Sequence, residues 1–157
     1  MIEQIYTYFT TDMIYMWLNL GVLPFWFVLM FFPQSQICKV FIRSIFPFFI
    51  LSLVYIYLLH LFFNEGYNFI RNFELYLGLS AMNNLFTDKN FIMLFWTHFL
   101  AMNLFCGGWI VKDSHKFGIN KILMSVPLLV TYFIGPIGLT IYWIIRIFYA
   151  KRINLYD

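Results

Sequence analysis

Charged side chains are scarce in this chain of 157 residues. Asp, Glu, Lys and Arg make up 11% of it, whereas soluble domains carry roughly 25%. Hydrophobic residues make up 62%, and a soluble domain of this length has too small an interior to bury so many side chains. The composition therefore excludes an ordinary soluble domain and indicates that lipid is the main solvent. We expect an all-α, multi-pass integral membrane protein that forms a single domain over residues 1–157.

The basic residues do not gather anywhere along the chain. The formal net charge is +3, and lysines and arginines stand singly at the ends of apolar runs. Nucleic-acid-binding proteins concentrate such residues on one face, so the pattern excludes nucleic acid as a partner and fits anchoring at a lipid interface. Residues 1–12 contain no basic residue, and we therefore expect no cleaved signal peptide.

Cysteine is nearly absent, and metal-binding patterns are weak. Cys38 and Cys106 lack metal-type spacing, so we expect both to behave as small apolar side chains. His60 and His98 are the two histidines within apolar runs, and no carboxylate within these runs completes the three protein ligands that a catalytic zinc needs. No metal and no cofactor are predicted. Nucleophile elbows, phosphate loops and metalloprotease helices are also missing.

Long apolar runs, in contrast, are abundant. Four of them reach the roughly 20 residues that a bilayer core requires, and they cover residues 13–32, 44–63, 90–111 and 122–145. The segment 73–86 is helical in pattern but too short to cross, which predicts an interfacial or re-entrant helix. The fold class is thus four transmembrane helices with a short helix between the second and third. In this arrangement five basic residues lie on each side, so the positive-inside rule leaves the orientation open.

One histidine and one amide stand well inside the third run, where polar groups are expensive and usually have a partner or a function. His98 lies eight residues into the run and Asn103 lies deeper. An imidazole transfers protons near neutral pH, so His98 is the best candidate acid or base; the alternative is a structural hydrogen bond between helices. Alternating spans predict that Asn19, His60 and His98 lie in one polar layer.

The fourth run is interrupted by the sequence Gly-Pro-Ile-Gly at residues 135–138. Pro136 removes a backbone donor and clashes with the preceding turn, which predicts a kink near the middle of the membrane. The kink either serves helix packing alone or opens a pocket beside the third span.

One ordered set of residues resembles the neoxanthin-synthase-like family, also called abscisic-acid-deficient-four-like, of small four-span membrane proteins in plastids and bacteria. The resemblance covers roughly residues 17–148. It rests on Trp96-Thr97-His98, Ala101-Met102-Asn103-Leu104-Phe105, Gly107-Gly108-Trp109-Ile110, Asp113 and Gly135-Pro136-Ile137-Gly138, with Asn19, Leu23-Pro24-Phe25-Trp26, Pro33 and Tyr55-Ile56-Tyr57-Leu58-Leu59 upstream.

The resemblance implies a carotenoid or related isoprenoid substrate, because plant members are implicated in converting violaxanthin to the allenic carotenoid neoxanthin. That reaction needs a proton donor at the epoxide oxygen and a base for the departing C–H proton, and His98 matches the family's histidine. The family usually has an acid where Asn103 stands and often an arginine where Gly108 stands. An amide orients a ligand but shuttles no protons at neutral pH.

The sequence thus favours a membrane enzyme that isomerises or rearranges a carotenoid, apocarotenoid or similar polyene. The alternative is a non-catalytic carotenoid- or lipid-binding accessory protein; a coupled transporter is less favoured because the runs contain no charged residue and no repeat. The expected partners are membrane lipid and a hydrophobic polyene, with the oligomeric state open. The catalytic candidates are His98 and Asn103, and the substrate-binding candidates are Asn19, Trp26, Tyr57, His60, Trp96, Trp109 and Pro136.

Overall fold

The computed structural model describes residues 9–151, 153 and 154, apart from the side chains of residues 42 and 43, and the described part is helical without strands. The chain divides into two compact units. The first contains residues up to Leu20 together with Phe49–Leu100, and the second contains Gly21–Phe48 together with the residues from Ala101 onward. Each unit is described below by itself.

Among the described residues, three helices are long and apolar enough to cross a membrane: α2 (Thr11–Phe31), α4 (Phe46–Asn64) and α6 (Lys89–Lys116). They agree with the first three predicted spans to within a few residues, except that α6 continues five residues beyond the predicted end at Val111. A short helix, α3 (Gln36–Arg43), follows α2, and the side chain of Ser35 caps it by accepting a hydrogen bond from the backbone of Cys38.

The predicted short helix at residues 73–86 is two helices in the first unit. A 3₁₀ helix, η2 (Phe69–Tyr76), precedes α5 (Leu79–Leu85). The break falls at Gly78, whose φ of 118° lies in a region that side-chain-bearing residues rarely adopt. A single continuous helix was therefore the wrong expectation for this segment, and the glycine is the reason.

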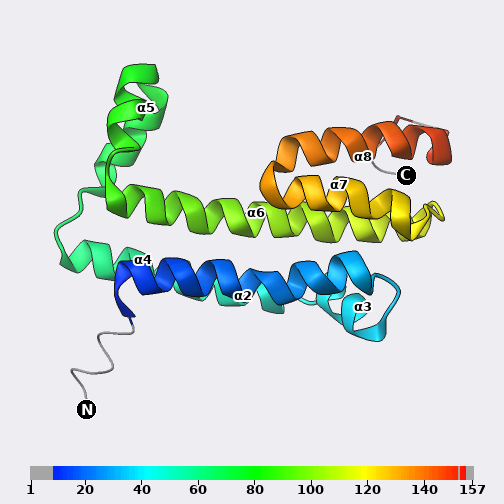
Figure 1. Ribbon diagram of the computed structural model, residues 1–157. Coiled ribbons are helices and arrows are strands. Elements are labelled where there is room, and N and C mark those ends of the chain that lie inside the picture. The colour runs from blue at the N-terminus through cyan, green and yellow to red at the C-terminus, as the bar shows by residue number, and fades with distance from the viewer. Residues whose placement is uncertain (1–8, 152, 155–157) are drawn as a thin grey trace, which may run out of the picture. The chain divides into compact units, whose positions relative to one another are not determined.

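The predicted fourth span, 122–145, is also not one helix. It consists of α7 (Lys121–Phe133) and α8 (Gly135–Ala150), which lie side by side in a hairpin within the second unit (Figure 1). Ile134 leaves the helical region with φ −140° and ψ 83°, and Pro136 follows in the first turn of α8, where its missing N–H is not needed. The sequence correctly marked the place of the break, but the chain reverses where a kink was expected.

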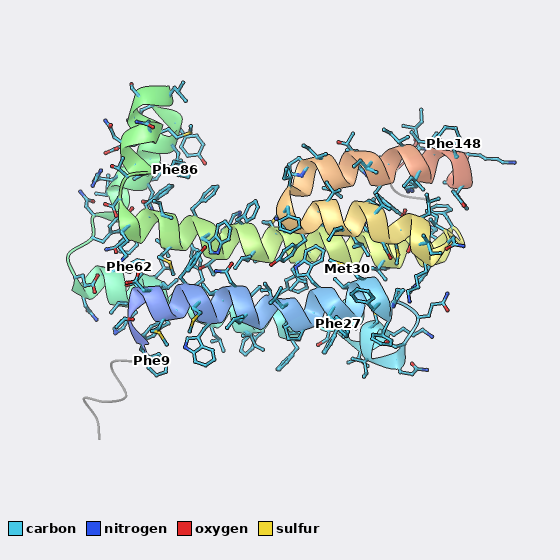
Figure 2. All side chains as sticks on the ribbon, in the orientation of Figure 1. Phe9, Phe27, Met30, Phe62, Phe86 and Phe148 are labelled. Atoms are coloured by element: carbon cyan, nitrogen blue, oxygen red, sulfur yellow. The ribbon has the colours of Figure 1, made fainter. Side chains whose placement is uncertain are left out.

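Large apolar side chains cover the outward faces of the helices (Figure 2). Phe27 on α2 is 54% exposed and Phe148 on α8 is 75% exposed, whereas Phe62 on α4 is fully buried. Soluble proteins rarely expose apolar surface on this scale. The apolar exterior therefore suits contact with lipid, as the composition predicted.

Candidate functional site: an aromatic cleft beside a buried ion pair

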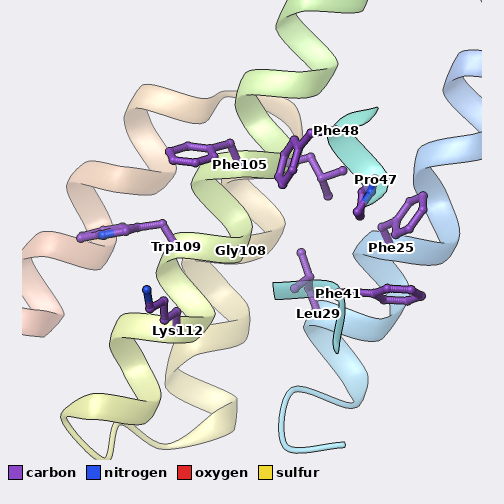
Figure 3. A pocket seen from close by; sticks show the side chains of 10 residues that line it. Phe25, Leu29, Phe41, Pro47, Phe48, Phe105, Gly108, Trp109 and Lys112 are labelled. Atoms are coloured by element: carbon purple, nitrogen blue, oxygen red, sulfur yellow. The ribbon is translucent and has the colours of Figure 1, made fainter. Parts of the chain in front are cut away.

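A cleft in the second unit is bordered by α2, α3, the start of α4, and α6 (Figure 3). Its volume is about 160 Å³. Most of its lining is aromatic or aliphatic, and the described residues that line it are Phe25, Leu29, Phe41, Pro47, Phe48, Leu104, Phe105, Gly108, Trp109 and Lys112. The arrangement offers flat apolar walls to a ligand with a ring or a conjugated chain.

Ring pairs between the elements form two walls of this cleft. Phe25 of α2 and Phe41 of α3 lie edge to face with their ring centroids 5.1 Å apart. Phe48 of α4 and Phe105 of α6 form a second edge-to-face pair at 5.9 Å. Such pairs contribute about 0.5–1.5 kcal/mol beyond their burial, so the walls are held by specific contacts between segments that are distant in sequence.

Gly108 and Lys112 belong to the α6 side of the cleft. They are four residues apart on the helix and therefore share a face. A Cβ added to Gly108 would meet no atom within 4 Å, so the glycine leaves open space in the cleft. Lys112 is the one ionisable side chain among the described lining residues, and its ammonium is a hydrogen-bond donor with no acceptor capacity.

A buried ion pair lies next to the cleft. The Nε–H of Arg146 on α8 donates to Oδ2 of Asp113 on α6 at 2.6 Å, and the hydroxyl of Tyr142 donates to the same oxygen at 2.8 Å. All three residues are at most 8% exposed. The guanidinium also donates to the carbonyl of Asn154 at 3.0 Å and lies 4.8 Å from the ring of Phe117. These charge-assisted bonds tie α8 to the end of α6.

Trp109 connects this ion pair with the cleft. Its ring packs edge-on against Tyr142, with centroids 5.6 Å apart, and it also lines the cleft. A ligand in the cleft therefore contacts a tryptophan whose other neighbour is the tyrosine that donates to Asp113.

Asn103 lies at the turn of the α7–α8 hairpin and is 6% exposed. Its Nδ2 donates to the carbonyl of Tyr132 at 3.5 Å, and its Oδ1 packs against Gly135 so closely that a Cβ there would collide. The last carbonyls of a helix lack partners within the helix, and within a membrane they must be satisfied by protein. The placement thus gives Asn103 a structural task, while its catalytic role stays a prediction.

Three further predicted residues lie in the second unit. Trp26 is 2% exposed, with its ring edge-on to Tyr132 at 5.4 Å. Its Cη2 would lie 2.8 Å from a Cβ added to Gly107, so the absent side chain of this glycine makes room for the indole. Trp109 lines the cleft, whereas Pro136 is exposed at the start of α8.

The first unit brings together only one pair of the predicted residues. The Nε1–H of Trp96 donates to Oδ1 of Asn19 at 3.3 Å, and the Asn19 amide donates to the carbonyl of Tyr15 at 2.7 Å. His60 is exposed and pairs with Asn64, one helical turn away, at 3.1 Å.

The other two predicted residues of this unit face outward. Tyr57 is 38% exposed and lies edge-on to Phe9. His98 is exposed as well, and within the described part of the chain it has no hydrogen bond or ion pair. The contacts described for Asn19 therefore extend to neither histidine, and a shared polar layer stays a prediction.

The sequence did not identify the ion pair. The third predicted span ended at Val111, two residues before Asp113, yet α6 continues to Lys116 and buries the carboxylate. The available signal was a carboxylate and an arginine placed at the ends of consecutive apolar runs. No group of three or more His, Cys, Asp or Glu side chains in the described part is placed to hold a metal ion.

Comparison with known proteins assigns the chain to a family. No curated protein and no solved structure matches the chain. The family model described as ABA DEFICIENT 4-like matches residues 13–142. The matched range includes all the residues that line the cleft, together with Asp113 and Tyr142 of the buried cluster. Because this match covers most of its length, the chain belongs to the ABA DEFICIENT 4-like family.

Proposed function

We propose that this protein is a membrane-embedded enzyme that binds a carotenoid or related polyene isoprenoid in the aromatic cleft and isomerises or rearranges it. The observation that carries the proposal is the lining of the cleft, which combines five aromatic rings with a single ammonium, that of Lys112. Conjugated chains and their end rings pack well against such walls. Membership of the family supports the substrate class.

The size of the cleft limits what it holds. Pockets that enclose a drug-sized ligand measure about 300–1,000 Å³, whereas this cleft measures about 160 Å³. A long polyene therefore places one end group in the cleft, and the rest of its chain runs along the apolar outer surface of the helices.

Lys112 supplies the polar contact for such an end group. Its ammonium donates a hydrogen bond to an epoxide or hydroxyl oxygen, which is the assistance that epoxide opening needs at oxygen. The second requirement is a base for the C–H proton. His98 stays the candidate that the sequence predicts for this role, but it lies 14 residues before Lys112 on α6 and is not one of the residues that line the cleft.

One observation favours a second candidate function, that of a non-catalytic binding protein that presents the polyene to a partner enzyme. Acid–base rearrangement needs two proton-transfer groups, and Lys112 is the one ionisable side chain among the described residues that line the cleft. The two functions share the ligand and the cleft, so the same experiment separates them.

The experiment is a pigment profile of cells that make defined carotenoids, with and without this protein. Gly108→Leu places a side chain in the cleft, because a Cβ at this position meets no atom within 4 Å. Gly21→Leu is the matched control, since a Cβ at this exposed position on α2 also meets nothing within 4 Å. Lys112→Gln tests the proposed contact at the ligand's oxygen, and His98→Ala tests the acid or base that the sequence predicts.

A new polyene that disappears in Gly108→Leu but persists in Gly21→Leu supports the enzyme. If the profile stays unchanged while pigment co-purifies with the wild type and not with Gly108→Leu, the binding function replaces it. Unchanged profiles and no bound pigment contradict both functions.

The hairpin also leads us to propose a topology of three crossings followed by a re-entrant segment. At 1.5 Å per residue, α7 and α8 are roughly 20 and 24 Å long, shorter than a core of about 30 Å. Asn103, beside the hairpin turn, lies 13 residues before the end of α6. The hairpin therefore enters from the side of the membrane where α6 ends and returns to that side.

With this topology the two sides of the membrane no longer carry equal numbers of basic residues. Among the basic residues whose side chains the structure describes, the side where α6 ends receives five, namely Lys39, Lys112, Lys116, Lys121 and Lys151, and the opposite side receives two, Arg71 and Lys89. Arg146 is buried in its ion pair and is not counted. The positive-inside rule then places the end of α6 and the end of α8 on the cytoplasmic side, opposite the start of α2.

A further inference from the structure

A second hollow lies in the second unit, bordered by the segment after α2, by α3, by the end of α6 and by the start of α7. Its volume is about 700 Å³, and it shares no lining residue with the aromatic cleft. Its lining is polar and includes Gln34, Lys39, His115, Asn120 and Lys121. The lining of this hollow is therefore polar, whereas that of the cleft is mostly apolar.

The charged side chains among the described residues that line this hollow are all basic. Lys39 and Lys121 are cations, His115 becomes one when protonated, and no described lining residue is a carboxylate. Within the described part of the chain neither lysine forms an ion pair. The Lys121 ammonium donates to the carbonyl of Phe31 and has two further N–H groups. A hollow with unbalanced positive charge attracts an anion.

The start of α7 adds to this potential. Lys121 is the first residue of α7, and the side chain of Asn120 caps the helix by accepting from the backbone of Ile122. The N-terminal end of a helix has partial positive charge, and it adds to the ammonium groups already present. Two independent features of the hollow, its side chains and a helix end, therefore favour a negative group.

The position of the hollow indicates which anion it meets. Gln34 follows α2 by three residues, His115 lies in the last turn of α6, and Lys121 opens α7. All these elements end or begin at the same side of the membrane under the proposed topology, so the hollow lies at headgroup level. Large apolar side chains of the same elements are exposed there, with Phe31 at 53%, Ile37 at 60% and Ile122 at 78%.

We propose that this hollow binds the phosphate of an anionic phospholipid, with the acyl chains on the neighbouring apolar side chains. The Lys39 and Lys121 ammonium groups donate charge-assisted hydrogen bonds to the phosphate oxygens. Basic pockets between membrane helices on the cytoplasmic side are suited to such headgroups. The site is separate from the aromatic cleft and does not depend on the chemistry proposed there.

The test is native mass spectrometry of the full-length protein, purified in detergent and mixed with phosphatidylglycerol or phosphatidylcholine. The variants are Lys39→Gln, Lys39→Arg and Lys121→Gln. Lys151→Gln is the matched control, because it removes the same charge from an exposed residue at the end of α8 that does not line the hollow. Thermal unfolding of each variant checks that it folds.

We expect wild type, Lys39→Arg and Lys151→Gln to retain phosphatidylglycerol, and Lys39→Gln and Lys121→Gln to lose about tenfold in affinity, as for one charge-assisted bond. Equal retention by all variants, or equal binding of phosphatidylcholine to wild type, overturns the proposal. Inorganic phosphate that stabilises the lipid-free protein as much as phosphatidylglycerol does would assign the site to a soluble anion and overturn the lipid. The comparison of lipids on wild type decides the question even if Lys39→Gln fails to fold.

Discussion

Gly138 of α8 packs directly on the backbone of Thr131 of α7: a Cβ added to the glycine would lie 2.6 Å from the Cα of Thr131. The hydroxyl of Thr131 donates back to the carbonyl of Pro127 at 2.7 Å and is thereby satisfied within its own helix. This close approach brings the two arms of the hairpin together near its turn.

Gly138→Ala should therefore separate the two arms of the hairpin. Overpacking of this kind costs about 1–3 kcal/mol of unfolding free energy, and here the colliding atoms belong to backbone that cannot turn away. The measurement is the unfolding midpoint in detergent. Gly108→Ala is the control, since it enters open space and removes a helix-destabilising glycine, a change of up to about 1 kcal/mol in favour of the helix. A Gly138→Ala protein as stable as Gly108→Ala would contradict the hairpin packing.

Asp113→Ala should lower the stability strongly, because it leaves the guanidinium of Arg146 buried without its carboxylate. Breaking one side of a buried ion pair costs about 3–5 kcal/mol. The double variant Asp113→Leu/Arg146→Met removes both charges and should recover most of this loss. The unfolding midpoints of the single and double variants provide the check, and an equal loss in both would show that the pair itself is not the source.

Asn103→Ala should weaken the turn of the hairpin, because the carbonyl of Tyr132 loses the amide that reaches it. An unpaired buried polar group costs about 1–3 kcal/mol. Pigment conversion per folded molecule distinguishes this role from catalysis. If the folded fraction stays at the wild-type level while turnover is lost, Asn103 belongs to the catalytic machinery and its structural role is secondary.

Cys38 should react slowly with alkylating reagents in the folded protein. Its side chain is fully buried on α3, and burial raises the pKa of the Cys38 thiol from 9.0 to about 11. Because the folded state holds the proton more tightly than the unfolded state, this contribution to stability is complete below pH 9 and disappears as the pH rises to about 11. The check is iodoacetamide labelling of the Cys106→Ser variant at pH 8 and pH 10. Labelling at pH 8 as fast as in denaturant would show that Cys38 is accessible.

The topology predicts that the two ends of the described chain lie on opposite sides of the membrane. In a background without native cysteines, Lys151→Cys should react with an impermeant maleimide from the same side as Gln36→Cys. Asn83→Cys should react from the opposite side. All three positions are exposed. Reaction of Lys151→Cys together with Asn83→Cys would restore the four-span arrangement.

The two predicted catalytic residues differ in burial, which the sequence did not predict. Their positions inside the third run singled out His98 and Asn103, but position in a run does not say which way a side chain points. α6 is apolar on nearly every side, so helical periodicity gives no inner face. Packing buries Asn103 and leaves His98 exposed. For the same reason the sequence could not select Gly108 and Lys112 as residues of a cleft.

The membrane setting, the three long helices and the break near Pro136 were determined by the sequence alone, because apolar length and a missing backbone donor act locally. The reversal of the chain at Ile134 was decided by the tertiary structure, since it needs Gly138 to meet Thr131. The tertiary structure also decided the ion pair and the cleft. Asp113 and Arg146 are 33 residues apart, and the rings of the cleft come from four helices. No local pattern encodes which distant side chains meet, because that depends on how all the helices share one interior.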